Sequence, residues 1–357
     1  MSGAFWSPGL GQLEPYTPGE QPDSGACIKL NTNENPYPPS PRALALLTSG
    51  DFANALRRYP DPESCQLRTT IAHRYGLKPA QVFVGNGSDE VLALSFYSFF
   101  RRPEPLLFAD ITYSFYPVYC QLFGITNRAV PLKEDFTIEV RDFAGRAGGV
   151  IIPNPNAPTG CYLPLENIEA LLQLQPNRVV IIDEAYIDFG GESAISLINR
   201  YPNLLVIHTL SKSYALAGLR LGFAMGQEPL IQGLLRAKNS FNPYPIDAIA
   251  QQVATAAIGD KAWHADNCGK VIATRKRSER ALQALGFTVI PSRANFILAK
   301  PPAPGAEALY QALRKRDILV RYFDQPRIRD YLRISIGTDV EMDQLIGNCT
   351  EILASQS

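Results

Sequence analysis

The chain has 357 residues, which is enough for two domains or for one large core with an attached lobe. Hydrophobic residues make up 46% and charged residues 19% of the chain, a composition that excludes a disordered protein. The 34 basic residues equal the 34 acidic ones, so the positive excess typical of nucleic-acid-binding proteins is missing. We therefore expect small-molecule chemistry and no nucleic-acid partner.

Cysteine and histidine usage argues against metal and disulfide sites. The six cysteines are scattered and form no C-x-x-C pair, a pattern that fits the reducing cytoplasm. His73, His208 and His264 lie far apart without H-E-x-x-H spacing, so we expect no metal centre and assign them structural roles. The N-terminus has no signal-peptide pattern and no apolar run reaches membrane-spanning length, so we expect neither export nor membrane insertion.

The elements along the chain predict an α/β fold. Prolines crowd the first forty residues and predict an extended arm. Short apolar, β-branched runs then alternate with longer segments, which indicates buried parallel strands joined by helices. The predicted strands are 81–84, 106–109, 126–130, 150–153, 179–182, 204–208 and 222–225. The last connection, 209–221, is short, which leaves an antiparallel final strand open as an alternative.

Polar residues collect directly after five of these strands. The segments are 85–90, 110–116, 154–160, 183–186 and 209–214. Because the carboxyl ends of parallel strands share one edge of an open sheet, these segments should meet in a single crevice.

The individual signals are ambiguous when taken alone. The glycine-rich loop 85–90 could cradle a phosphate at a helix N-terminus, or it could be a capping turn. Asp183 is either a cap or a functional carboxylate, and lysines such as Lys212 are usually surface residues. Together with Arg220, they match what pyridoxal 5′-phosphate (PLP) needs. A lysine bonds to its aldehyde, an acid pairs with its pyridinium nitrogen and an arginine holds its phosphate.

At these motifs the chain resembles the fold-type I aminotransferases over essentially its whole length, and within them the histidinol-phosphate aminotransferases. The segment 211–222 resembles the family's cofactor-lysine motif, and 183–186 resembles its pyridinium motif. The resemblance implies catalytic roles for Lys212, Asp183 and Tyr186. It implies cofactor contacts for these three residues and for Ser88, Asp89, Tyr113, Asn156, Ser211, Arg220 and Tyr59.

The resemblance also implies an architecture and an assembly. The fold would be the PLP-dependent transferase fold type I, with a mostly parallel seven-stranded sheet flanked by helices and a smaller α+β lobe. We expect the large domain to span 40–255 and the lobe to combine 1–39 with 256–357. The apolar segments 281–285, 288–290, 296–299 and 332–336 supply helix and strand for that lobe. Tyr59 would enter the neighbouring subunit's site, which implies a homodimer.

One departure from the family pattern concerns the residue before Pro158. The family commonly has Asn there, bonded to the cofactor's phenolic oxygen, whereas this chain has Ala157. Either Asn156 substitutes through a local shift, or Tyr186 makes that contact alone. Ile111, which replaces the family's usual Pro before Thr112, carries no side-chain chemistry.

The substrates that the resemblance implies are L-histidinol phosphate and 2-oxoglutarate, converted to imidazole acetol phosphate and L-glutamate in histidine biosynthesis. One pocket must then accept a phosphate and a carboxylate, and an arginine pairs bidentately with either. The resemblance assigns this role to Arg333, with Arg321, Tyr16 and Asn35 as further substrate contacts. Without the resemblance, the two arginines would be expected at the surface or at a strand edge, and Tyr16 would be expected to pack in a loop.

Three alternatives remain open at this stage. Aromatic amino-acid aminotransferases and threonine-phosphate decarboxylases need the same lysine, aspartate and arginines. A non-catalytic PLP-binding regulatory module is disfavoured, because no helix-turn-helix pattern or basic surplus accompanies the motifs.

Overall fold

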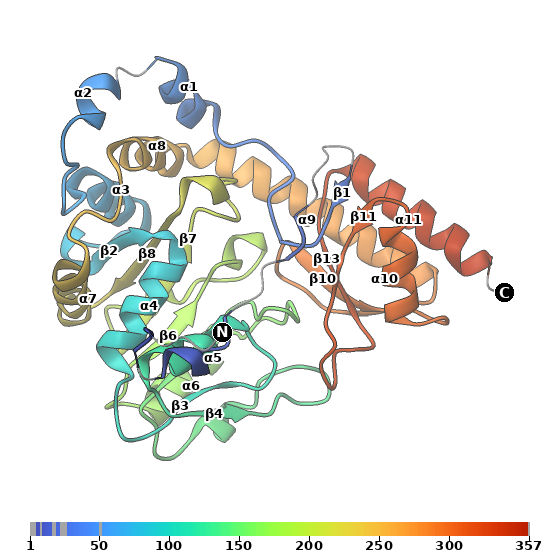
Figure 1. Cartoon of the computed structure of the whole chain (residues 1–357), viewed down its shortest axis with the longest axis horizontal. Coiled ribbons are helices and arrows are strands. Elements are labelled where there is room, and N and C mark those ends of the chain that lie inside the picture. Colours follow the sequence, from blue (N-terminus) through green and yellow to red (C-terminus); the bar gives the residue numbers. More distant parts are fainter. Residues whose placement is uncertain (1–4, 8, 16–18, 22–26, 50–51, 356–357) are drawn as a thin grey trace.

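The computed structural model describes residues 5–7, 9–15, 19–21, 27–49 and 52–355. They form a large lobe around a seven-stranded sheet and a smaller lobe around a four-stranded sheet (Figure 1). The strand order in the large sheet is β2-β8-β7-β6-β5-β3-β4. Its strands are β2 (Val82–Asn86), β3 (Leu106–Ala109), β4 (Asn127–Val130), β5 (Gly149–Pro153), β6 (Val180–Asp183), β7 (Leu204–Thr209) and β8 (Leu221–Gly226).

All seven predicted strands are confirmed, and no end differs from the prediction by more than two residues. The alternative of an antiparallel last strand is also confirmed, because β8 pairs antiparallel with both β2 and β7. The pairs among β3, β4, β5, β6 and β7 are parallel. The sheet is therefore mostly parallel, and the carboxyl ends of β5, β6 and β7 meet at one edge.

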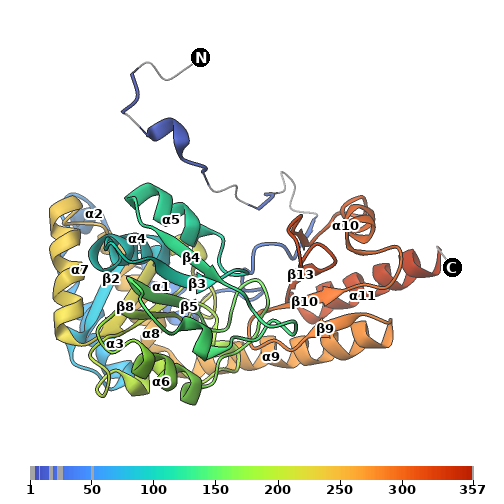
Figure 2. The same ribbon diagram turned by 90° about the horizontal axis from the view of Figure 1, so that it is seen from below.

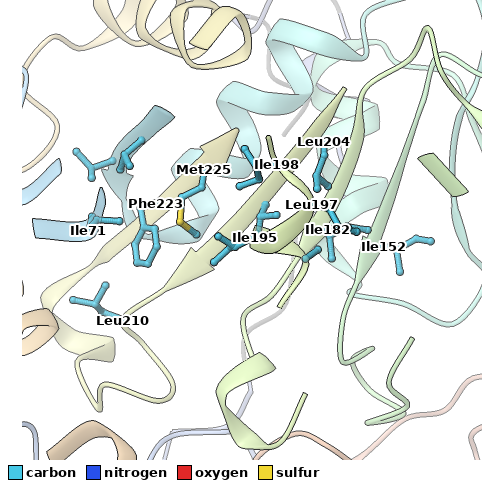
Figure 3. Close-up of a cluster of buried hydrophobic side chains, with 14 of the residues drawn as sticks. Ile71, Ile152, Ile182, Ile195, Leu197, Ile198, Leu204, Leu210, Phe223 and Met225 are labelled. Carbon is cyan, nitrogen blue, oxygen red and sulfur yellow. The ribbon is translucent and has the colours of Figure 1, made fainter. Parts of the chain in front are cut away.

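The central parallel strands β5, β6 and β7 are buried along their whole length because helices cover both faces of the sheet, whereas the edge strand β4 is mostly exposed. Successive residues of β6 belong to opposite cores: Ile182 packs with one hydrophobic cluster and Ile181 with the other. Figure 3 shows the first cluster, in which Ile152 and Ile182 lie near Leu197. The helices around the sheet are α1 (Pro41–Ser49), α2 (Phe52–Leu56), α3 (Cys65–Tyr75), α4 (Gly87–Phe99), α5 (Phe115–Phe123), α6 (Leu165–Leu174), α7 (Glu228–Phe241) and α8 (Ala248–Gly259).

The smaller lobe contains an antiparallel sheet in the order β12-β13-β10-β9. Its strands are β9 (Thr288–Ile290), β10 (Phe296–Lys300), β12 (Arg321–Tyr322) and β13 (Leu332–Ser335), and its helices include α10 (Ala306–Arg314) and α11 (Asp339–Ala354). The arm strand β1 (Ile28–Lys29) pairs parallel with β11 (Ile318–Leu319), which ties the N-terminal segment to this lobe. These strands confirm the predicted α+β lobe.

Helix α9 (Lys261–Ala284) runs from beside α8 into the smaller lobe (Figure 1). The large-lobe core includes Ile258, whereas Cys268 packs in the smaller-lobe core. We propose that the chain divides near the start of this helix, close to the predicted boundary. Within the described part of the chain, α9 included, no helix is long and apolar enough to cross a membrane.

Figure 2 shows the N-terminal segment, which carries the short helix η1 (Leu10–Gln12), projecting from the body above α5. The amide nitrogen of Glu14 donates to Gln121 of α5 over 2.9 Å. Phe5 and Trp6 are exposed. The Gln121 side chain also donates to the Gln12 carbonyl, so residues 9–15 contact the body through α5.

Candidate active site

A pocket of about 280 Å³ opens at the sheet edge where the polar loops follow the strands. Residues from the arm, from all five predicted loops and from the smaller lobe line it. Ten of the predicted site residues are among them: Ser88, Asp89, Tyr113, Asp183, Tyr186, Ser211, Lys212, Arg220, Arg321 and Arg333. Three others, Tyr59, Asn156 and Asn35, do not line the pocket, and Tyr16 lies outside the described residues.

One end of the pocket is a tight backbone cradle. A Cβ atom added to Gly222 would lie 2.3 Å from the amide nitrogen of Ser88, and one added to Gly87 would lie 2.7 Å from an Arg220 nitrogen. Only glycine permits this approach of β8 to the first turn of α4. The free amides of a helix N-terminus and an arginine head converge here, the arrangement that binds a phosphate.

Arg220 is held in an unusual conformation at this end. Its φ is +56°, in the left-handed region that non-glycine residues rarely adopt. Its guanidinium donates to Asp89 over 2.9 Å and to the carbonyl of Ala217 over 3.1 Å. Strained residues of this kind cluster at functional sites. The loop after η6 (Ala217–Leu219) thus aims a cation at the cradle.

Lys212 lies in the loop after β7, and its amino group projects into the pocket. Its Nζ donates to the carbonyl of Thr32 over 3.1 Å and lies 5.8 Å from the centre of the Tyr186 ring. Asn35 donates its side-chain amide to the Lys212 carbonyl over 3.0 Å. The arm therefore contacts both ends of the lysine, and Asn35 acts on its backbone.

Asp183 ends β6, and its carboxyl group is buried at the floor of the pocket. Tyr116 of α5, itself fully buried, donates its hydroxyl to Asp183 Oδ2 over 2.8 Å. Burial raises the pKa of Asp183 to about 6, although the Tyr116 hydroxyl and the Ala185 amide partly oppose this rise. A positively charged ring nitrogen beside Asp183 would keep the carboxylate ionised. Nothing in the sequence pattern points to Tyr116, because its spacing on α5 resembles that of any core residue.

The other wall of the pocket contains Tyr186 and Ala157. Asn33 donates its side-chain amide to the Tyr186 hydroxyl over 3.1 Å, and it is a pocket residue that the sequence analysis did not single out. Ala157 faces the pocket and packs with Phe296 and Tyr186. Of the two alternatives for the phenolic oxygen, the geometry favours Tyr186, because Asn156 points elsewhere.

Asn156 is buried and stabilises the loop after β5, and it does not line the pocket. Its amide donates to the Ile111 carbonyl over 3.0 Å and to the Thr159 hydroxyl over 2.9 Å. Replacing Asn156 with alanine should lower the free energy of unfolding by about 1–3 kcal/mol, because two buried groups lose their donor. Urea unfolding of the variant and titration with PLP would check this. A large loss of PLP affinity without a loss of stability would contradict it.

Two arginines of the smaller lobe face each other across the strands β12 and β13. Arg321 and Arg333 are directly opposite in the strand register, and both line the pocket. Arg333 also lies 5.5 Å from the ring centres of Phe296 and Phe323, and it donates to the Asn31 carbonyl over 2.7 Å. Like charges in cross-strand positions repel each other, so this pairing favours an anion bound between them.

Comparisons with known proteins agree with this geometry. The sequence profile of the family described as aminotransferase class I and II matches residues 26–348. This chain belongs to that family. The site residues suit its cofactor, PLP, because the pocket combines a lysine, a buried acid and a phosphate cradle. The protein is thus a PLP-dependent aminotransferase.

Close relatives of this aminotransferase carry a more specific name. It is 55% identical over 353 residues to a histidinol-phosphate aminotransferase of Acetobacter pasteurianus, covering 99% of each chain. It is 55% identical over 343 residues to histidinol-phosphate aminotransferase 2 of Thiobacillus denitrificans, covering 96% of each chain.

Solved structures show the same fold. The histidinol-phosphate aminotransferase of Clostridium acetobutylicum superposes with a TM-score of 0.84 at 25% identity, covering 91% of this chain and 98% of that one. The enzyme of Sinorhizobium meliloti, solved with pyridoxal-5′-phosphate, superposes with a TM-score of 0.83 at 24% identity over 92% of each chain. The expected fold, the PLP-dependent transferase fold type I, is therefore confirmed.

Each part of this aminotransferase's pocket has a distinct task. PLP supplies, when bound, an electron sink for the electron pair left at the substrate's α-carbon. With PLP bound, Asp183 would hold a proton on the ring nitrogen by its negative charge, and Tyr186 would donate to the phenolic oxygen. Lys212 would be the base that takes the proton from the α-carbon. The aromatic face of Tyr113 and the apolar walls at Pro153 and Ala157 exclude water.

Proposed function

We propose that this aminotransferase exchanges an amino group between L-histidinol phosphate and 2-oxoglutarate, giving imidazole acetol phosphate and L-glutamate in histidine biosynthesis. The observation that carries the proposal is the cross-strand pair Arg321 and Arg333 in the pocket. One substrate ends in a phosphate and the other in a carboxylate, and the same two planar guanidinium groups can pair with either anion. The names of the close relatives support the same assignment.

A two-step spectroscopic experiment tests the proposal. Purified holoenzyme is mixed with L-histidinol phosphate, and loss of the visible band of lysine-bound cofactor is followed. Addition of 2-oxoglutarate should then restore that band. A protein that ignores L-histidinol phosphate but responds to phenylalanine would be an aromatic aminotransferase. Release of carbon dioxide from threonine phosphate would indicate the decarboxylase alternative. A band that responds to none of these amino donors would contradict the proposed substrates.

Replacing Arg333 with methionine should lower kcat/KM for both substrates by roughly 10²-fold, because truncating the half-buried cationic partner of a bound anion costs about 2–3 kcal/mol, the lower part of the range for buried pairs. The Arg333→Lys variant should recover only part of the loss, since an ammonium group cannot pair bidentately. Steady-state kinetics with each substrate would measure both effects. Arg329→Met is the matched control, because Arg329 pairs with Asp324 on the surface of the same lobe. An equal loss in that control would contradict the assignment.

We further propose that two copies of this chain form a homodimer in which Tyr59 reaches the neighbouring pocket. Tyr59 is 83% exposed and stacks on Tyr244 at 4.6 Å between ring centres, outside its own chain's pocket. Leu56 and Phe241 are also strongly exposed, and large apolar side chains left in solvent favour burial against a partner. The expected cytoplasmic location rests on the six cysteines, all of which are free.

A further inference from the structure

A cluster of buried titratable groups surrounds Asp188, outside the pocket. Asp188 lies in the short helix η4 (Ile187–Phe189), directly after Tyr186. Its Oδ2 lies 2.5 Å from the Ser213 hydroxyl, 3.3 Å from His264 Nε2 and 3.4 Å from His208 Nε2. Asp188, Ser213, His208 and His264 do not line the pocket, so substrate or cofactor contact does not explain why they are together.

The hydrogen-bond pattern around Asp188 is directional. Arg74 approaches His264 Nδ1 at 3.5 Å, and because arginine can only donate, Nδ1 accepts and the ring proton lies on Nε2, facing Asp188. Tyr214 stacks on the His264 ring at 4.2 Å. The Ser213 hydroxyl donates to the same carboxylate. Asp188 is therefore an acceptor for donors from separate parts of the chain.

The charge state of Asp188 agrees with this pattern. Burial by itself would raise the pKa of this carboxyl group, but His208, His264 and the Ser213 hydroxyl together hold it well below its ordinary range. Glu184, four residues earlier, behaves in the opposite way: burial raises its pKa to about 8, so it is protonated at neutral pH. The Asp188 side chain is only 19% exposed. It can therefore stay ionised only while the groups that donate to it remain in place.

The elements that meet at Asp188 are those that place the catalytic lysine. Ser213 follows Lys212 directly, and His208 precedes Thr209, whose hydroxyl accepts from the amide of Ser211 over 3.1 Å. His264 belongs to α9, the helix that connects the two lobes. Fixing Ser213 therefore fixes the backbone from which Lys212 extends.

We propose that Asp188 is a positioning residue for Lys212: by holding the Ser213 hydroxyl it orients the loop so that the lysine amino group meets the cofactor aldehyde. The competing explanation is that this cluster only stabilises the fold. The two differ in what they predict for the cofactor. If Asp188 positions Lys212, its replacement weakens only the bond between the lysine and the cofactor aldehyde. If the cluster only stabilises the fold, its replacement weakens the binding of every ligand of the pocket alike.

The test compares two ligands of the cofactor-free full-length protein. PLP can bond to Lys212, whereas pyridoxine 5′-phosphate has the same ring and phosphate but no aldehyde. In the Asp188→Asn variant, PLP affinity should fall about tenfold, the loss expected for one charged hydrogen bond, while pyridoxine phosphate affinity stays unchanged. Equal losses for the two ligands, or no loss for either, would overturn the proposal. Binding of pyridoxine phosphate does not depend on the amino donor, so this result is separate from the substrate assignment.

Three further variants separate positioning of Lys212 from a purely structural role. Ser213→Ala removes the hydroxyl without disturbing the histidines, and it should reproduce the selective loss of PLP affinity even if Asp188→Asn folds poorly. If Asp188 acts through Ser213, the double variant should lose no more than either single variant, whereas additive losses would contradict that path. Glu184→Gln is the matched control, because Glu184 is a fully buried carboxyl group that does not line the pocket, pairs with Ser193 and the Ala194 amide and is protonated at neutral pH. A selective loss of PLP affinity in this control would also overturn the proposal.

Discussion

The Lys212→Ala variant should have almost no transaminase activity, with kcat reduced on the order of 10⁴-fold or more. The variant loses the covalent partner of the cofactor aldehyde and the base that moves the α-proton, and a positioned base alone contributes up to about 10⁴-fold. Among the described residues that line the pocket, no other lysine is present to replace its amino group. Single-turnover kinetics with L-histidinol phosphate and the visible spectrum of the holoenzyme would measure the loss.

Lys270→Ala is a suitable control for this variant. Lys270 is exposed on α9 and pairs with Asp266 four residues earlier, so its removal should leave kcat and the spectrum unchanged. Substantial turnover by Lys212→Ala would refute the assignment of the base. Circular dichroism would show whether Lys212→Ala remains folded. If it does not, Lys212→Arg is the variant to test, because it retains the positive charge. Lys212→Arg should be almost as inactive as Lys212→Ala.

The Asp183→Asn variant should lose on the order of 10²–10³-fold in kcat, the cost of removing one preorganised charge from a catalytic centre. Asparagine fills the same buried space and can still accept from the Tyr116 hydroxyl, so the change removes charge with little change of shape. Without that charge the ring nitrogen loses its proton and the cofactor becomes a poorer electron sink. Steady-state kinetics and the melting temperature of the cofactor-free variant would separate catalysis from stability.

The pH dependence of cofactor affinity gives an independent check on Asp183. Burial raises the pKa of this group to about 6 in the protein without its cofactor, and PLP requires the ionised form. The affinity for PLP should therefore reach its full value well above pH 6. Below pH 6 it should fall about tenfold per pH unit, because protons compete for the carboxylate. The Asp183→Asn variant should lack this step, while keeping any step that belongs to the phosphate of PLP itself. A step of equal size in both proteins would contradict the role of Asp183.

The sheet and most of the pocket could be predicted because both depend on local patterns. Fully apolar runs followed by polar loops place side chains such as Asp183 and Lys212 at one sheet edge, whichever helices connect them. The orientation of Asn156 could not be predicted, because its amide turns toward Ile111 and Thr159, which are set by tertiary packing. The pairing of Tyr116 with Asp183 depends on how α5 packs on the sheet.

The facing positions of Arg321 and Arg333 depend on the strand register in the smaller lobe. Nothing in the spacing between residues 321 and 333 determines that register, since an irregular loop joins β12 to β13. Asn33 was missed for a related reason. Its contact with Tyr186 exists only because the arm crosses the pocket, and its left-handed φ of +55° turns the side chain inward.

The reversed direction of β8 has a mechanical consequence for this enzyme. Because β7 and β8 are antiparallel neighbours, the chain leaves β7 through Lys212 and re-enters the sheet just after Arg220, so a single short hairpin carries the lysine and the phosphate-site arginine. Their separation is set within that hairpin and does not depend on the relative placement of the lobes. The anion-facing Arg321 and Arg333 belong to the other lobe. A rotation between the lobes would therefore move Arg321 and Arg333 to fit substrates of different length. The distance between Lys212 and Arg220, which hold PLP, would stay constant.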